Sequence, residues 1–260
     1  MKNSEKIQEY FTTHINSLDG WFYPIDALLF AYISEIQEQC SFYGNLCEVG
    51  VFKGKSLSFL CLMANELEKV YGIDLYDGSD YSDTLKTIFT VTGDEKSAVL
   101  IQENSLNITF DELVKIIGAP LRFLHIDAGH LFEEVLSDLE KFSQLMSPIG
   151  VVVLDDYYDR AYPGICAAVH SFLINDNFTN FVPFAIGANK IYLCNPSLAN
   201  HYQRQLITKP HFQNDLRLQV IHKNPVLIPY AGKQSSDAEK IRQLLDNNQQ
   251  SGCGESFRSS

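Results

Sequence analysis

The chain has 260 residues, 45% of them hydrophobic and 20% charged, which is the composition of an ordinary globular protein with a sizeable core. Its formal net charge of −12 at pH 7 disfavours a nucleic-acid or anionic-membrane surface, because such a surface needs clustered lysine and arginine. We therefore expect neither nucleic acid nor a membrane as a partner.

The first 43 residues contain two predicted helices, over 5–17 and 24–39, which precede the main repeating pattern. Between them, SLDGWFYP is a turn that holds the only tryptophan, Trp21. The polar start MKNSEKIQEY lacks the apolar core of a signal peptide, and no apolar run is long enough to span a membrane. These features predict a cytoplasmic protein in which residues 1–43 form a helical cap or lid.

Between residues 44 and 195, the predicted core domain, β-rich runs alternate with helical segments. The expected strands are 45–51, 70–76, 98–104, 121–127 and 150–156, and the expected helices are 56–68, 82–92, 110–118, 131–146 and 164–176. Such βαβ units predict a parallel sheet with helices on both faces.

After the last of these helices, FVPFAI and NKIYLC are strand-like runs separated by a short turn that contains glycine. This pattern predicts a hairpin, so that the sheet ends in an antiparallel addition. The predicted fold is α/β, with a doubly wound, mostly parallel seven-stranded sheet and an antiparallel C-terminal hairpin. A dinucleotide-binding fold would instead repeat βαβ units in both halves.

Residues 196–260 are a C-terminal extension with weaker signals. QVIHKNPVLIPY predicts one more extended segment, 236–246 a short helix, and the tail NNQQSGCGESFRSS has the composition of disorder. The six cysteines form no CxxC pair and have no close histidine at zinc spacing. We interpret them as small buried hydrophobes in a reducing compartment.

The loop after the first strand, EVGVFKGKS, has the composition of a ligand-binding turn. Gly50 and Gly54 allow a sharp turn and a close approach of a ligand, and Ser56 lies near free N–H groups at the start of the next helix. Burying Glu48 at the end of the first strand costs free energy unless its carboxylate meets a partner or a ligand. Asp74 ends the next strand, where its carboxylate can accept hydrogen bonds from the two hydroxyls of a ribose. The spacing is neither GxGxxG nor a P-loop, and a tight turn without a ligand remains the alternative.

At the end of the third strand, Asn104 and Ser105 lie where the base of a nucleoside could be met. The same two residues would equally well cap the next helix.

Three aspartates follow neighbouring strands: Asp127 after the fourth, Asp155 and Asp156 after the fifth. The carboxyl ends of parallel strands meet at one edge about 4.8 Å apart, and hard cations bind such oxygens. Without a visible lysine or arginine partner, we expect either a cation among them or a raised pKa. The alternatives are that Asp127 caps a helix and that DDYYDR is a solvated loop.

Two histidines flank Asp127 in HIDAGH. His130 follows at the start of a helix, where its neutral imidazole could take a proton from a substrate hydroxyl or could merely cap and pack. His125 lies deeper on the strand, and we interpret it as a core histidine.

Together these residues resemble the class I S-adenosylmethionine-dependent methyltransferases, with their Rossmann-like fold. CEVGVFKGKS is similar to the first motif of that family, VYGIDLYD to the second, and FVPFAIGANKIYLC to its closing strands. The resemblance implies that the cofactor is held by Glu48, Gly50, Gly54, Ser56, Asp74, Asn104, Ser105 and Asp127. It covers residues 44–195.

LHIDAGHLFEEVLSDLEKFSQLMSPIGVVVLDDYYD resembles more narrowly the metal-dependent small-molecule and sugar O-methyltransferases of the macrocin type. This implies magnesium or another divalent cation on Asp127, Asp155 and Asp156, with His130 as the catalytic base. Some relatives have aspartate where Gly129 stands, and catechol-type enzymes have lysine at the position of His130.

The function implied is methyl transfer to a hydroxyl of a small molecule or sugar, with a vicinal diol suited to two-point binding by the metal. An NAD(P)-dependent oxidoreductase and a non-catalytic cofactor-binding module are the alternatives. A homo-oligomer is compatible with the sequence but not specified by it.

Overall fold

The computed structural model describes residues 3–78, 80–175, 180–212 and 216–229. The strands are Asn45–Val49 (β1), Val70–Asp74 (β2), Val99–Gln102 (β3), Leu121–Ile126 (β4), Met146–Leu154 (β5), Val182–Ile186 (β6), Ile191–Cys194 (β7), Leu216–Ile221 (β8) and Asn224–Pro229 (β9). The α-helices are Ser4–Glu9 (α1), Pro24–Gln39 (α2), Lys55–Met63 (α3), Asp80–Thr92 (α4), Phe110–Ile117 (α5), Phe132–Ser143 (α6), Pro163–Ile174 (α7) and Pro196–Leu206 (α8).

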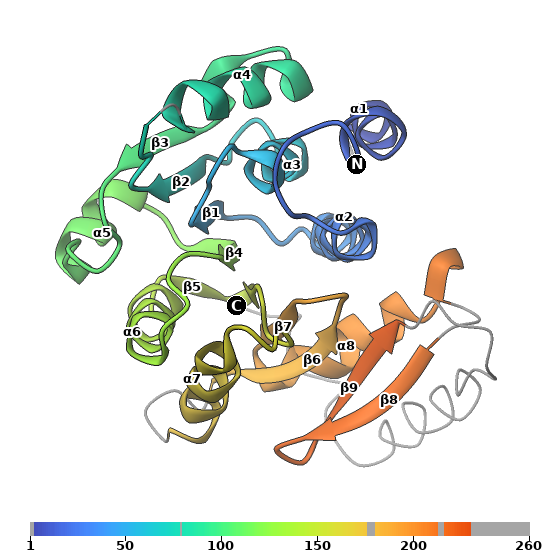
Figure 1. Cartoon of the computed structure of the whole chain (residues 1–260). Helices are drawn as coiled ribbons and strands as arrows, with labels where there is room; N and C mark the ends of the chain where they lie inside the picture. The colour runs from blue at the N-terminus through green and yellow to red at the C-terminus, as the bar shows by residue number, and fades with distance from the viewer. Residues whose placement is uncertain (1–2, 79, 176–179, 213–215, 230–260) are drawn as a thin grey trace.

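All the strands form one sheet, in the order β3-β2-β1-β4-β5-β7-β6-β9-β8 (Figure 1). Strands β1 to β5 are parallel, and β7 pairs antiparallel with both β5 and β6. The order reverses between β1 and β4, which is where doubly wound sheets bind ligands at the carboxyl ends of their strands. The predicted α/β fold, with its parallel core and antiparallel hairpin, is confirmed.

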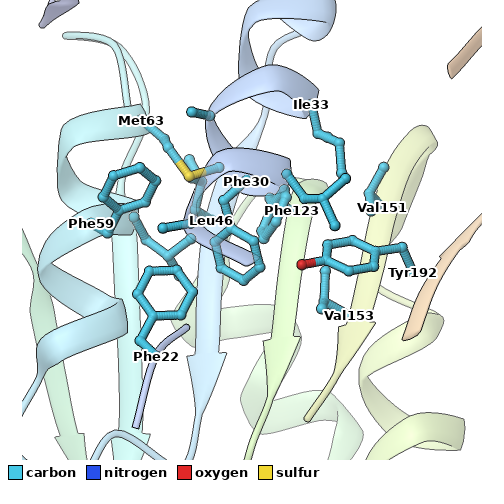
Figure 2. Packing of buried hydrophobic residues seen from close by; sticks show 14 of the residues in the cluster. Phe22, Phe30, Ile33, Leu46, Phe59, Met63, Phe123, Val151, Val153 and Tyr192 are labelled. Carbon is cyan, nitrogen blue, oxygen red and sulfur yellow. The ribbon is translucent and has the colours of Figure 1, made fainter. Parts of the chain in front are cut away.

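The two faces of the sheet have separate apolar cores because successive strand residues point to opposite sides. On β1, Leu46 belongs to the core under α2 and α3, whereas Cys47 belongs to the core under α5, α6 and α7. Figure 2 shows the first of these cores, where Phe30 and Ile33 of α2 pack against Phe123 and other strand side chains. Helix α2 therefore covers the middle of the sheet. The boundaries at residues 44 and 195 stay predictions.

In the described part of the chain the sheet has nine strands rather than the predicted seven, because the segment expected as one extended run folds back as a hairpin, β8–β9. Its two-residue turn is His222-Lys223, with φ of +46° and +66°. Positive φ at both positions is the geometry of a type I′ turn, which usually has Asn-Gly. The His-Lys sequence carries no such signal, so the turn could not be predicted. The predicted helix 236–246 and the predicted disordered tail lie outside the described residues.

No helix in the described part of the chain is long and apolar enough to cross a membrane. The cysteines in the described ranges, Cys40, Cys47, Cys61, Cys166 and Cys194, are free thiols.

Candidate functional site

A cavity of about 740 Å³ opens at the carboxyl edge of the sheet, a volume typical of small-molecule sites. It is bordered by the loop after β1, the ends of β2 and β3, the segments after β4 and β5, and residues 19–23 before α2. Of the predicted site residues, those that line it are Gly50, Ser56, Asp74, Asn104, Ser105, Asp127, His130, Asp155 and Asp156.

The loop after β1 needs glycine for two separate reasons. Gly50 has φ of +84°, and a Cβ placed on it would lie 1.9 Å from the carbonyl oxygen of Asp127. Gly54 has φ of +80° and precedes α3, whose first turn carries Ser56 at the wall of the cavity. The first N–H groups of a helix have no partner within the helix, so this N-terminal end can bind an anionic group.

Asp74 is held against this loop by backbone hydrogen bonds. Its carboxylate accepts from the N–H groups of Val51 (2.5 Å), Phe52 (2.8 Å) and Tyr76 (3.0 Å). Each carboxylate oxygen has more than one lone pair, so hydroxyl donors from a ligand can still be accepted. The structure thus places the predicted ribose residue at the wall of the cavity with a fixed orientation.

Glu48, in contrast, does not reach the cavity wall. The sheet register pairs Glu48 with His125 on the adjacent strand, so both side chains lie on the same face, and both are fully buried. His125 Nδ1 and Glu48 Oε1 are 2.6 Å apart, while Glu48 Oε2 and His125 Nε2 have no partner among the described residues. The predicted cofactor contact of Glu48 is therefore not seen in this geometry, and His125 is a core histidine as expected.

Asp155 has a cationic partner, contrary to our expectation that the aspartates lack one. The buried Lys190, just before β7, forms an ion pair with Asp155. Burial alone would raise the pKa of Asp155, but the Lys190 ammonium outweighs it and the pKa is lowered. The pKa of Asp127 is raised by burial and by the neighbouring charge of Asp155. The sequence could not show the pair, since Lys190 lies 35 residues from Asp155 in a hairpin turn.

The three aspartates divide into two sets. Asp127, His130 and Asp156 have ligand atoms that all lie within 4.8 Å of one another, and so do Asp127, Asp155 and His125. Lys190 already neutralises the second set. In the first, His130 Nε2 lies 3.1 Å from Asp156 Oδ2. Asp156 has φ of +53°, a strained conformation that aspartate tolerates better than most residues and that often marks a functional site.

Aromatic rings surround the mouth of the cavity. Tyr162 stacks on His130 with ring centroids 4.0 Å apart, and Trp21 stacks on Phe52 at 5.7 Å. The segment that carries Trp21 is fastened to the glycine loop, because Lys55 donates to the carbonyl of Gly20 at 3.0 Å. Residues 19–23 therefore border the entrance, and the role of residues 1–43 as a cap or lid stays a prediction.

The loop after β3 has a buried carboxylate behind it. Ser105 donates its hydroxyl to Asp138 Oδ2 at 2.9 Å, and Asp138 Oδ1 has no partner among the described residues. Asn104, in contrast, accepts from the N–H of Leu106 as a local turn cap. Asp138 lies on the apolar stripe of α6 with Val135 and Leu139. A charged residue on such a stripe is the signal that could have identified it from sequence.

Replacing Asp138 with asparagine is expected to stabilise the protein at pH 7.5 by about 1–3 kcal/mol and to have little effect near pH 4. Burial raises the pKa of Asp138 to about 6 in the folded chain, against 3.8 as the ordinary value. The folded chain therefore binds more protons between about pH 4 and 6, and Asp138 lowers the free energy of unfolding as the pH rises through that window. Urea unfolding at several pH values measures this, and a pH-independent difference would contradict it.

With the fold and the cavity described, comparison with known proteins shows what the chain is similar to. Residues 47–157 match the sequence family described as a methyltransferase domain. Together with the α/β fold, this match confirms the prediction of an S-adenosylmethionine-dependent methyltransferase and disfavours an NAD(P)-dependent oxidoreductase.

The methyltransferase is 23% identical over 180 residues to the uncharacterized protein R132 of Acanthamoeba polyphaga mimivirus, a match that covers 68% of this chain and 79% of R132. Three similar structures have TM-scores of 0.51–0.53 and sequence identities of 14–18%, which show the fold alone.

One is CalS11, a TDP-rhamnose 3′-O-methyltransferase of calicheamicin biosynthesis (TM-score 0.53, 14% identity), with 74% of this chain and 93% of CalS11 covered. Another is the Bacillus cereus O-methyltransferase in complex with SAH, with a TM-score of 0.51 and 14% identity. The match covers 74% of this chain and 90% of that enzyme. The third is MycE in complex with Mg, SAH and mycinamycin VI, with a TM-score of 0.51 and 18% identity. The match covers 75% of this chain and 53% of MycE.

Proposed function

We propose that this methyltransferase transfers the methyl group of S-adenosylmethionine to a hydroxyl of a small molecule, with a divalent cation held by Asp127 and Asp156. The observation that carries the proposal is the Asp127–His130–Asp156 set, whose ligand atoms lie within 4.8 Å of one another in the same cavity as the glycine loop. Two carboxylates and a candidate base at one wall are the groups that activation of a hydroxyl requires.

The donor set fits a hard cation. Asp127 and Asp156 supply carboxylate oxygens. Burial and the charge of Asp155 raise the pKa of each in spite of Lys190, so a bound cation would favour their ionised form. Asp155 is the weaker candidate ligand because its carboxylate already pairs with Lys190. A divalent cation bound by Asp127 and Asp156 would favour the ionised form of the acceptor hydroxyl.

His130 is positioned by Asp156. An ionised Asp156 would accept the 3.1 Å hydrogen bond from the Nε2–H of His130, and in the proposed reaction Nδ1 is then the basic nitrogen. Tyr162 holds the plane of the ring by stacking. In the proposed reaction, His130 takes the proton of the acceptor hydroxyl while the glycine loop and Asp74 orient the methyl donor.

Replacing Asp156 with asparagine is expected to lower methyl transfer by about 100-fold or more and to weaken the binding of Mn²⁺, a spectroscopic probe for the site. Binding of S-adenosylhomocysteine should stay within about threefold of wild type, because Asp156 follows β5, which β1 and β4 separate from the end of β2 where Asp74 lies. Radiolabelled methyl transfer to a panel of diols, electron paramagnetic resonance of Mn²⁺ and calorimetry measure the three quantities.

Asp111, exposed on α5 outside the cavity, provides the control variant Asp111→Asn. Full activity in EDTA, together with unchanged Mn²⁺ binding in Asp156→Asn, would show that the metal proposal is wrong. Tight cofactor binding without transfer to any diol would instead favour the non-catalytic module.

A further inference from the structure

The cavity carries a large excess of negative charge. Among the described residues, nine carboxylates and a single lysine, Lys55, line it. Lys53 and Lys190 pair with Asp19 and Asp155, and Lys55 offsets a third carboxylate, while a methyl donor brings one net positive charge and a divalent cation brings two. The carboxylates therefore still outnumber the positive charges when the site is loaded, and a cleft lined by one sign of charge attracts ligands of the other.

Among these carboxylates, Asp159 follows Asp156 closely in sequence but takes no part in the proposed metal site or in positioning His130. A short turn fixes it between Asp156 and Tyr162, since the Asp159 N–H donates to the carbonyl of Asp156 (3.0 Å) and the Tyr162 N–H to that of Asp159 (3.1 Å). Asp159 Oδ1 also accepts from the N–H of Ala161 at 2.7 Å. Its charge is thus held at the cavity wall on the His130 side.

The rings at the entrance supply the second element of recognition. Trp21 is 78% exposed, Tyr23 is 50% exposed and Tyr162 is 38% exposed, and all three line the cavity. Soluble proteins rarely leave large aromatic side chains together at a cavity mouth unless a ligand uses them. The faces of these rings carry negative potential and attract both flat rings and ammonium groups.

We infer that the acceptor is a ring-bearing hydroxyl compound with a basic amine, and that phosphorylated or carboxylated acceptors are excluded. The inference rests on the proposed function and names its substrate class. The ammonium lies toward Asp159 and the aromatic entrance while the hydroxyl reaches His130. An anionic acceptor, such as a sugar attached to a nucleoside diphosphate, would bring its charge against the uncompensated carboxylates.

Three vicinal diols that differ mainly in charge test this: dopamine, catechol and 3,4-dihydroxybenzoate. Each is titrated into the protein loaded with S-adenosylhomocysteine and Mg²⁺, and the fluorescence of Trp21 is followed. Trp21 is the only tryptophan of the chain, so the signal comes from the cavity entrance. We expect dopamine to bind at least tenfold more tightly than 3,4-dihydroxybenzoate at low ionic strength, with catechol between them and the gap narrowing in 0.5 M salt.

The variant Asp159→Asn is expected to reduce the dopamine-to-catechol affinity ratio about threefold to tenfold, whereas Asp111→Asn leaves it unchanged. If dopamine does not bind, if 3,4-dihydroxybenzoate binds as tightly, or if the ratio is the same in Asp159→Asn, the inference is wrong. Calorimetry with S-adenosylhomocysteine alone, together with methyl transfer to catechol, separates this from failure of the proposed function, which would show as no cofactor binding or as transfer to none of the diols.

Discussion

Replacement of Lys190 by methionine is expected to lower the free energy of unfolding by about 3–5 kcal/mol, because it leaves buried carboxylates without their cation. Burial alone would lower the pKa of Lys190, but Asp155, Asp127 and Asp26 together raise it, so the ammonium is stabilised by all three. Methionine has similar length and adds no volume, so the loss is electrostatic rather than steric. Urea unfolding followed by circular dichroism measures it.

The matched control is Lys86→Met. Lys86 also pairs with an aspartate, Asp83, at 3.0 Å, but its side chain is 73% exposed, so the loss should be below about 1 kcal/mol. If Lys190→Met does not fold, Asp155→Asn in the same background removes one orphaned charge and is expected to restore soluble protein. Equal losses for Lys190→Met and Lys86→Met would contradict the buried pair.

Replacement of Gly50 by alanine is expected to cost more than about 4 kcal/mol and to abolish soluble expression or cofactor binding. The left-handed conformation at φ of +84° costs an alanine about 1–2 kcal/mol. The larger part comes from the Cβ, which would lie 1.9 Å from a backbone oxygen of Asp127 that cannot move without parting β1 from β4. Soluble yield, urea unfolding and calorimetry with S-adenosylhomocysteine report the effect.

Gly93→Ala isolates the conformational part of that cost. Gly93 has nearly the same φ, +81°, but a Cβ there would meet nothing within 4 Å. We expect a loss of only about 1–2 kcal/mol for this variant. A similar loss for Gly50→Ala would mean that the close contact with Asp127 relaxes at little cost.

The βαβ order, the closing hairpin and the glycine loop could be predicted from sequence, because local periodicity and turn residues specify them. The placement of Gly50, Asp74, Asp127 and His130 around one cavity followed from a single rule, that parallel strands end at a common edge. Nothing local indicates which side of the sheet a strand residue faces when both sides are buried. Glu48 was therefore expected at the ligand but pairs with His125.

Contacts over long sequence separations were also missed. Lys190 meets Asp155, and Asp26 of α2 accepts from the hydroxyl of Tyr192 on β7 at 2.8 Å. A lysine beside a hairpin turn is usually solvated, so the sequence gives no reason to expect Lys190 to be buried. Its burial follows from the packing of α2 over the sheet. Such a pair becomes visible only when the register of β5 against β7 is known.

The contact between Gly50 and Asp127 also bears on how the two substrates are aligned. The N–H of Asp127 donates to the carbonyl of Val49 at 2.7 Å, and that of Gly50 donates to Ile73 at 2.9 Å. The half of the cavity that would hold the methyl donor and the half that would hold the acceptor are thus joined through backbone atoms. Their separation is set by the spacing of β1 and β4 and does not depend on the rotamers of side chains. In-line displacement tolerates little error in that separation, so in the proposed reaction the central strands would fix the distance between the reacting atoms.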